Sequence, residues 1–531
     1  MPPFEMNRPP DHVACLTAET TLPLAAAAEG HFEGHGIALS AESNEGVLSL
    51  RLRTSVPLMW VRVRWAERIP EGLRYLGDAW DLRRHSLEWR GIVPERPLPW
   101  YFLAHDGQHT HGVGVQTGPA ALCQWHIDPY GVTLWMDVRN GSGPVEPGDR
   151  EIPLAQIVVR SGRVWEAPFQ AAQRFAAQLD RARLMPEQPV YGFDCESEAG
   201  AWDAGRLQEF AHLLGELAEN TVNRPFFLVG SGWQEGGAGH GTVRMRAGDA
   251  LGDMEALAAA IADETCRPGL WLRPLLSMAD EHESLALPLD RTGTRDTGWV
   301  LDPTHPEAVE QIQQAVRQAV DWGYEMICHD RIASDLLDHR GGRSDGAEQG
   351  WRFSDVTLTT AEVLRQVYET LRRAAGDRTL VIGRNTLGHL AAGQVHVQHI
   401  VGSRAARQRN IGHLIGINAL AFRGFHHGAL YAAEADPVCL YSQLPWSLNE
   451  QWLSLLASSG TPCLVAPGIE PPDDDVQRAL HAAFDQASRQ LPLAEPQDWL
   501  ANTSPGRWKL GNETVTYDWF SAHYEEPLGH P

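Results

Sequence analysis

Acidic, basic and aromatic side chains recur at the ends of short apolar runs in the middle of this sequence. The clearest case is "GYEMICHD", residues 323–330, in which Asp330 comes directly after the apolar run. If the ends of such runs meet in the folded protein, two carboxylates there could act as a nucleophile and as a general acid and base. This is the chemistry that cleaves glycosidic bonds. Arginine and histidine beside them would bind polar groups, and tryptophan would stack on a flat apolar face such as that of a sugar ring.

The ends of the apolar runs supply the candidate site residues. We predict catalytic roles for Asp330, Asp436 and Glu196. The predicted substrate-binding residues are Asp194, Trp233, Trp271, Arg273, His329, Arg384, His399 and Arg404. Acids at strand ends also cap helices and pair with arginine, so each of these positions has a structural interpretation beside the chemical one. His399 is a second candidate proton donor, because the unperturbed pKa of histidine lies near neutrality; a histidine hydrogen-bonded in the wall of the fold is the alternative.

Eight strand-like runs alternate with helix-length amphipathic runs between residues 181 and 490. The strands are expected at 190–194, 226–230, 269–273, 324–329, 379–383, 395–401, 419–424 and 462–466. In the first intervening run, helical spacing joins Leu207, Phe210, Leu214 and Leu217. Eight βα units over about 300 residues predict a (β/α)8 TIM barrel, in which the carboxyl ends of the strands meet at one opening. An open doubly wound sheet is the alternative, but no GxGxxG follows an early strand.

Two smaller regions flank the predicted barrel. Residues 1–180 consist of short alternating runs broken by turn signals, which predicts an antiparallel β-sandwich. Within this region, Asn140-Gly141 predicts a hairpin between the alternating run before it and the run at 151–159. Residues 491–531 are expected to form a short C-terminal β segment, a hairpin around Gly511-Asn512.

Composition excludes several classes of partner. The 44 Lys and Arg residues are outnumbered by 68 Asp and Glu, and the net charge of -24 argues against nucleic acid and anionic membranes as partners. No run approaches the roughly 20 apolar residues of a membrane helix, and no signal peptide begins the chain, so we expect a cytoplasmic protein. Homo-oligomerisation is only a default expectation, because the sequence reveals no interface.

The sequence predicts neither a metal nor a cofactor. The 7 cysteines have no CxxC spacing, which argues against a disulfide framework and against a zinc ribbon. His396 and His399 should face opposite sides of their strand, so they cannot easily bind one metal ion together. The sequence also has no GxSxG elbow, no Walker loop and no HExxH motif.

Five segments occur in an order that is found in a known group of enzymes. They are "SGWQ" (231–234), "RPGLWLRP" (267–274), "LDPTHPEAVEQI" (301–312), "YEMICHD" (324–330) and "LYAAEADPVCLY" (430–441). This set resembles the clan D glycoside hydrolases of the α-galactosidase and raffinose-synthase type. The resemblance implies an N-terminal β-sandwich, a catalytic barrel, a C-terminal β-domain and a carbohydrate substrate.

Compared position by position with the family's motifs, this sequence matches the catalytic nucleophile. It does not match the family's acid/base carboxylate or the other polar residues of its motifs. The family's fourth strand ends in Lys-x-Asp, and the Asp is the nucleophile; here that place holds Asp330, with Cys328 in place of the Lys. The family draws its acid/base carboxylate from the region after strand six, where residues 399–410 contain no Asp or Glu. The family's Asp-Asp-Gly-Trp after strand two reads Gly-Ser-Gly-Trp here, at residues 230–233.

Two hypotheses of different classes remain open. The first is a retaining α-glycosidase of altered specificity, with Asp330 as nucleophile and an acid/base from Asp194, Glu196, Glu434 or Asp436. The second is a non-hydrolytic carbohydrate-binding protein in which arginines bind an anionic group such as a uronate, sulfate or phosphate. Unrelated chemistry is a third and weaker idea, because the barrel fold hosts many reactions.

Overall fold

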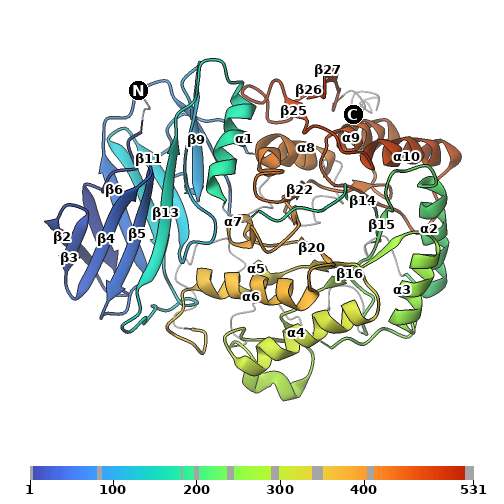
Figure 1. Cartoon of the computed structure of the whole chain (residues 1–531), viewed down its shortest axis with the longest axis horizontal. Coiled ribbons are helices and arrows are strands. Elements are labelled where there is room, and N and C mark those ends of the chain that lie inside the picture. The colour runs from blue at the N-terminus through green and yellow to red at the C-terminus, as the bar shows by residue number, and fades with distance from the viewer. Residues whose placement is uncertain are drawn as a thin grey trace, which may run out of the picture.

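The chain folds into a β-rich N-terminal part, a barrel and a small C-terminal sheet. A computed structural model describes residues 4–80, 87–180, 183–195, 202–235, 244–288, 298–337, 351–402 and 412–520. In Figure 1 the N-terminal strands, blue to teal, lie beside a ring of helices that surrounds the barrel strands, green to red. This arrangement confirms the predicted fold class.

The N-terminal part is an antiparallel sheet that folds over into two layers. Its strands are β1 (His12–Leu16), β2 (Thr21–Ala28), β3 (His31–Gly34), β4 (Ile37–Asn44), β5 (Val47–Thr54), β6 (Trp60–Ala66), β7 (Arg74–Gly77), β8 (Leu98–Pro99), β9 (Tyr101–His105), β10 (Thr110–Val115), β11 (Leu122–Asp128), β12 (Gly131–Asp137) and β13 (Ile152–Arg160). They pair in the order β7-β9-β10-β13-β5-β4-β3-β2-β1-β6-β12-β11-β8. Alternate residues of β5 and β6, among them Leu50 and Val63, are fully buried in one shared core. The period of two therefore gives each strand one face for this core.

The predicted hairpin at Asn140-Gly141 is wrong. β12 pairs with β11 and β6, whereas β13 pairs with β10 and β5, so the chain crosses from one layer to the other after residue 137. Asn140 instead holds the barrel segment: its Nδ2 donates to the carbonyl oxygens of Asp355 and Leu358, at 2.9 and 2.7 Å. The Asn-Gly pair thus forms a local turn, but its side-chain partners are distant in the sequence.

The barrel is a closed parallel sheet. Its strands are β14 (Tyr191–Cys195), β15 (Phe226–Val229), β16 (Arg267–Leu272), β19 (Met326–His329), β20 (Leu380–Gly383), β21 (Val397–His399), β22 (Ala432–Glu434), β23 (Val438–Cys439) and β24 (Cys463–Ala466). They pair in the order β22-β21-β20-β19-β16-β15-β14-β24-β23. Because only three residues separate β22 from β23, the two ends of this order are halves of one interrupted strand, which closes the barrel.

Helices cover the outside of the barrel and join the strands (Figure 1). The helices and short connecting elements are α1 (Pro168–Leu179), α2 (Ala204–Leu217), α3 (Met254–Asp263), β17 (Leu276–Ser277), η2 (Asp280–Leu285), β18 (Trp299–Val300), α4 (Pro306–Asp321), α5 (Ile332–Leu336), α6 (Thr360–Ala375), α7 (Gly388–Ala391), α8 (Gly412–Arg423), η5 (Gly424–His426), α9 (Trp446–Ser458) and α10 (Asp474–Ala487). The predicted face of α2 is buried as expected, from Leu207 to Leu217. α6 begins with a capping box formed by Thr359 and Glu362, which satisfies two backbone amides at its first turn.

One of the eight predicted strands is wrong. Residues 419–424 fall in α8 and the following η5, and the seventh strand is instead β22 with β23. All described side chains of α8 from Ile415 onward are buried, so the helix shows no polar face and no helical period in its hydrophobicity. An apolar run of this kind cannot be separated from a buried strand by its pattern.

Two hydrophobic layers fix which side chains face the barrel interior. A small inner cluster includes Phe226, Trp271, Cys328, Ile382 and Val397. The alternate residues of the same strands pack outward against the helices in a separate, larger cluster. Side chains along a strand alternate between its two faces. Along each barrel strand, every second residue, counted from a residue of the inner cluster, therefore points towards the barrel axis.

The small C-terminal sheet and a helix–strand contact complete the fold. β25 (Glu495–Pro496), β26 (Arg507–Leu510) and β27 (Glu513–Thr516) form an antiparallel sheet that contains the hairpin predicted around Gly511-Asn512. At the junction, a Cβ on Gly112 of β10 would lie 2.3 Å from the ring of Phe175 in α1. Glycine at 112 is therefore what lets α1 pack directly on the sandwich.

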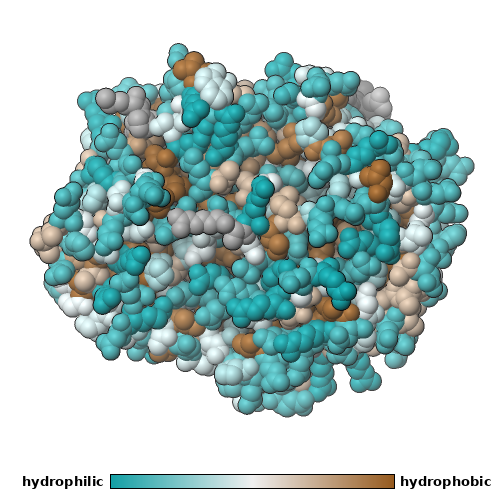
Figure 2. Space-filling model, in the orientation of Figure 1, coloured by the Kyte–Doolittle hydropathy of each residue, from teal (hydrophilic) through white to brown (hydrophobic). Residues whose placement is uncertain are grey.

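Hydrophilic residues predominate on the face of the molecule in Figure 2, and apolar residues there form small separate groups. The largest exposed apolar side chains of the described chain include Tyr130, Val164 and Trp165. None of the described helices is both long enough and apolar enough to cross a membrane.

Candidate active site

Polar side chains gather at the carboxyl ends of the barrel strands, as the fold requires. The inner-face alternation directs Asp194 of β14, His399 of β21 and Glu434 of β22 towards the barrel axis, together with Asp330 and Arg384, which follow β19 and β20. Most of these side chains are buried. We call this set the mouth residues.

Asp330 sits one residue beyond β19 and is half-buried. Its Oδ2 accepts a hydrogen bond from Trp271 Nε1 at 3.3 Å, and its Oδ1 accepts one from the backbone N–H of Arg331 at 2.6 Å. Arg331 has a φ of 65°, in the left-handed region that L-residues rarely adopt. The chain therefore turns sharply after the carboxylate, and two donors hold the carboxylate in place.

Asp194 and Arg384 form a buried ion pair inside the barrel. Arg384 Nη2 lies 2.5 Å from Asp194 Oδ2, and the two side chains are 5% and 0% exposed. A buried pair of this kind is destabilising to break, because the remaining charge has no water to solvate it. Arg273 and Asp335 form a second buried pair, with two hydrogen bonds of 2.8 and 3.1 Å.

His399 and Glu434 form a buried pair on neighbouring parallel strands. They are register partners, and His399 Nδ1 lies 2.5 Å from Glu434 Oε2. The second carboxylate oxygen of Glu434 has no hydrogen-bond partner among the described residues. The mouth therefore holds a carboxylate and an imidazole in direct contact.

Two predicted binding residues do not face the mouth. His329 immediately precedes Asp330, so alternation turns it outward, where its ring stacks on Tyr368 of α6. Burial lowers the pKa of His329 to about 4. Trp233 packs in the outer cluster against Trp322 and donates from Nε1 to the carbonyl oxygen of Trp271 at 2.7 Å. Both side chains therefore pack behind the mouth residues.

The other predicted residues have different positions. Trp271 belongs to the inner cluster, under Asp330. Asp436 is buried in the break between β22 and β23. Glu196 and Arg404 lie outside the described residues.

The sandwich contributes to a cleft beside the mouth, which the sequence did not predict. Its walls include Asp78, Trp80 and Trp100 from the sandwich and His389 and His399 from the barrel. The sandwich wall and the barrel wall come from segments about 300 residues apart in the sequence, so no local pattern links them.

A buried ion pair ties the sandwich wall of this cleft to the barrel. Arg423 Nε donates to Asp78 Oδ1 at 2.7 Å, and Trp100 Nε1 donates to Asp78 Oδ2 at 3.0 Å. Burial is the largest influence on the Asp78 carboxyl and would by itself raise its pKa. The charges of Arg423 and His426 and the hydrogen bonds from Trp100 and Arg423 together outweigh burial, so the pKa is lowered. Asp78 therefore stays charged in the wall of the cleft.

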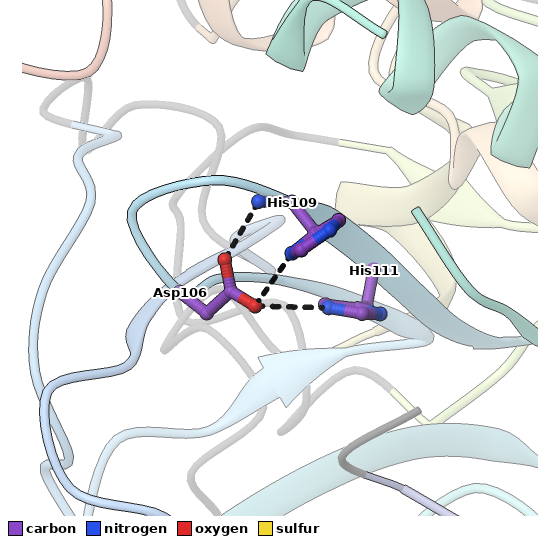
Figure 3. A group of neighbouring side chains, drawn as sticks. All are labelled: Asp106, His109 and His111. Carbon is purple, nitrogen blue, oxygen red and sulfur yellow. Dashed lines mark hydrogen bonds and ion pairs between the residues drawn. The ribbon is translucent and has the colours of Figure 1, made fainter. Parts of the chain in front are cut away.

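One group of side chains among the described residues has the donor types of a metal site. Asp106, His109 and His111 lie on the β9–β10 hairpin of the sandwich (Figure 3). Asp106 Oδ2 lies 2.9 Å from His109 Nδ1 and 3.6 Å from His111 Nε2. However, Asp106 Oδ1 accepts from the backbone amides of Gln108 and His109, and His111 Nδ1 accepts from Gly162 N–H at 3.3 Å. The carboxylate therefore clamps the turn, and the His111 tautomer carries its proton on Nε2, the atom that a metal would need.

Comparisons with known proteins bear on the fold. No family model matches the sequence, and no curated protein matches it significantly. The structure is similar to an α-galactosidase from Thermus thermophilus in complex with p-nitrophenyl α-D-galactopyranoside, with a TM-score of 0.59 and 15% identity over 96% of this chain and 99% of that chain. The fold is that of the GH36 α-galactosidases.

Two further solved structures support this assignment of the fold. A variant of the GH36 α-galactosidase AgaA from Geobacillus stearothermophilus, in complex with raffinose, has a TM-score of 0.62 and 12% identity, covering 94% of this chain and 79% of that chain. The galactosidase domain of the α-galactosidase–sucrose kinase AgaSK has a TM-score of 0.57 and 12% identity, covering 91% and 70%. The similarity to the GH36 fold spans both the sandwich and the barrel.

Proposed function

We propose that the protein is a glycoside hydrolase that cleaves an α-linked sugar with retention of configuration, with Asp330 as the nucleophile. In this reaction the carboxylate attacks the anomeric carbon, the glycosidic C–O bond breaks, and water later hydrolyses the glycosyl-enzyme. The observation that carries the proposal is the position of Asp330, half-buried at the end of the fourth barrel strand, with its Oδ2 bonded to Trp271 Nε1.

The surroundings of Asp330 suit a polar substrate. The Asp194–Arg384 pair presents buried charged groups within the same barrel, and sugar hydroxyls can both donate to and accept from such groups. Similar folds bind galactosyl oligosaccharides: the solved relatives hold raffinose and stachyose. Position 328, a Cys, and positions 230–231, Gly-Ser, lack the charged Lys and Asp side chains that the family resemblance implies, which favours a different specificity from that of the α-galactosidases.

The test is turnover of a panel of aryl α-glycosides by wild type and by Asp330→Ala. We expect wild type to cleave at least one member and the variant to lose more than about 10³-fold in kcat/KM, since a nucleophile cannot be replaced by packing. Asp302→Asn is a control in a buried acid that caps the turn before α4. Full turnover by Asp330→Ala would contradict the assignment.

The alternative function is carbohydrate binding without hydrolysis. It is favoured by one feature of the described residues: the end of the sixth strand carries His399 and no carboxylate. A wild-type protein that shows no turnover on the panel but gains thermal stability from one of the sugars would support binding in place of catalysis.

A further inference from the structure

His399 occupies a position from which it can exchange a proton with a substrate. It ends β21, and Val397, two residues before it, belongs to the inner cluster, so His399 faces the barrel axis. His399 also lines the cleft between the barrel and the sandwich. Asp330 follows β19, and β20 lies between the two strands, which puts their backbones about 10 Å apart. Inward side chains from both strands can therefore reach the two sides of one bound sugar.

The contact with Glu434 leaves one imidazole nitrogen available. Nδ1 lies 2.5 Å from Glu434 Oε2, so Nδ1 carries a proton and donates it to the carboxylate. Nε2 has no hydrogen-bond partner among the described residues. An imidazole that is oriented by a carboxylate through one nitrogen, with the other nitrogen free, is the arrangement of a general base and acid.

Other histidines of the barrel show what a purely structural histidine looks like here. His396 Nδ1 accepts a backbone hydrogen bond from Val381 at 3.0 Å, and His427 Nδ1 accepts one from Ala433 at 3.2 Å. Neither lines the cleft, and burial lowers the pKa of each to about 4. Those rings stay neutral near pH 7 and serve as acceptors in the barrel wall. His399 differs because its Nδ1 meets a carboxylate and its ring borders the cleft.

We propose that His399 is the general acid and base of the hydrolysis and that Glu434 is its positioning residue. The inference rests on the proposed glycosidase function. In the first step, Asp330 forms a bond to the anomeric carbon, the glycosidic C–O bond breaks, and the Nε2 proton of the imidazolium passes to the leaving oxygen. In the second step, neutral Nε2 takes a proton from water while the water oxygen bonds to the anomeric carbon and the bond to Asp330 breaks. The proton on Nδ1 stays with the Glu434 contact throughout.

The decisive experiment varies the leaving group. The substrates are the dinitrophenyl and the methyl α-glycoside of the sugar that wild type cleaves fastest. We expect His399→Ala to lose about 10³-fold in kcat/KM on the methyl glycoside, because its leaving oxygen needs a proton. On the dinitrophenyl glycoside, whose leaving group needs none, we expect a loss of less than about 10-fold in kcat/KM. Added azide should raise kcat of the variant and yield a glycosyl azide of retained configuration, since azide attacks the glycosyl-enzyme without a base.

Two further variants separate catalysis from structure. His396 directly precedes β21 but faces away from the cleft. In His396→Gln, any loss in kcat/KM should be independent of the leaving group, and azide should not raise kcat. Glu434→Gln keeps the size of the side chain but removes the charge, and it should show the same leaving-group dependence as His399→Ala at a smaller loss; Glu434→Asp should recover part of it.

The outcomes distinguish this inference from the proposed function. The hydrolase proposal is supported if wild type cleaves the glycosides and Asp330→Ala does not. In that case, a His399→Ala variant that loses activity equally on both substrates and gains nothing from azide would overturn the assignment of His399 alone. If wild type cleaves no α-glycoside, both proposals fall together.

Discussion

A carboxylate meets a histidine in two regions of this molecule, with different surroundings. On the sandwich hairpin, Asp106 lies beside His109 and His111, and its oxygens and the His111 ring also bind backbone amides. At the barrel mouth, Glu434 and His399 are buried, and one oxygen and one nitrogen of the pair have no partner among the described residues. The same residue types therefore clamp a turn in one place and leave groups available for a ligand in the other.

The contrast extends to the ion pairs. The barrel buries Asp194–Arg384 and Arg273–Asp335, whereas the strands of the sandwich carry exposed pairs such as Arg53–Glu151. Buried pairs constrain geometry strongly, because breaking one leaves a charge without solvent. Exposed pairs contribute little, because water and salt screen them. The two buried pairs therefore hold charged side chains in fixed positions near the carboxyl ends of the barrel strands.

The largest predicted effect is acid unfolding of the barrel. Burial lowers the pKa of His329, His389 and His426 to about 4 in the folded protein, whereas an unfolded histidine has a pKa of about 6.5. Below pH 6.5 the unfolded chain binds protons that the folded chain does not, so stability is complete above that pH and falls until about pH 4. Urea unfolding from pH 7 to pH 4 should show this fall. In His329→Phe the free energy of unfolding should depend less steeply on pH over this range. An unchanged pH dependence would contradict a neutral, buried His329 ring in the folded protein.

The next effect compares a buried ion pair with an exposed one. Arg384→Met should lower the free energy of unfolding by about 3–5 kcal/mol, because Asp194 stays buried beside an apolar side chain. Arg53→Ala, on the sandwich surface, should cost less than about 1 kcal/mol. Chemical denaturation of both variants measures the difference. Equal costs would mean that the buried pair is no more important to the fold than the surface pair.

A third prediction concerns activity at the two carboxylate–histidine sites. Glu434→Gln should lower kcat/KM on an unactivated α-glycoside by about 10²-fold, since His399 loses the charge that orients it. Asp106→Asn should leave kcat/KM unchanged, because the hairpin lies in the sandwich and lines no part of the cleft. Steady-state kinetics on the two variants decides between the sites. If Asp106→Asn lost as much kcat/KM as Glu434→Gln, the conclusion that only the barrel pair takes part in the reaction would be contradicted.

The smallest effect is on the stability of the hairpin. Asp106→Asn keeps an oxygen for the backbone amides of Gln108 and His109 but loses the charge, so it should cost about 1 kcal/mol. Burial alone would raise the pKa of the Asp106 carboxyl, but those amides and His109 outweigh it and lower the pKa. Wild type should therefore lose this contribution as the pH falls below the ordinary pKa of an aspartate towards the lowered one, whereas the variant, which has no carboxyl at position 106, should not. Thermal unfolding of both proteins at pH 7 and at acidic pH checks the sign.

Much of the barrel was readable from local pattern. All but one of the predicted strands coincide with observed strands, because short apolar runs of β-rich residues were bounded by helices with a clear polar face. The exception, 419–424, lies in α8, which is buried on all sides and so carries no period. In the sandwich, Asn140 failed as a hairpin signal because its amide group binds residues 355 and 358, more than two hundred positions away.

The candidate site divides in the same way. Asp330, Asp194, Arg384 and His399 were predicted at the mouth, since a residue that ends a barrel strand must lie there wherever the strand goes. His329 and Trp233 were predicted there too but pack behind the mouth, because a position near a strand end does not fix which face a side chain takes. The roles of the mouth residues stay predictions until the variants are measured.

The sequence by itself determined the order of strands and helices and therefore which residues end each barrel strand, because hydrophobic periodicity is a local property of the chain. Only the tertiary structure decided which of those residues meet: His399 with Glu434, Asp194 with Arg384, and Asp78 of the sandwich with Arg423 of the barrel. Such pairs join segments that are 35 to 345 residues apart. Their contact depends on strand register and on the packing of whole layers, and neither of these is encoded in any short stretch of the chain.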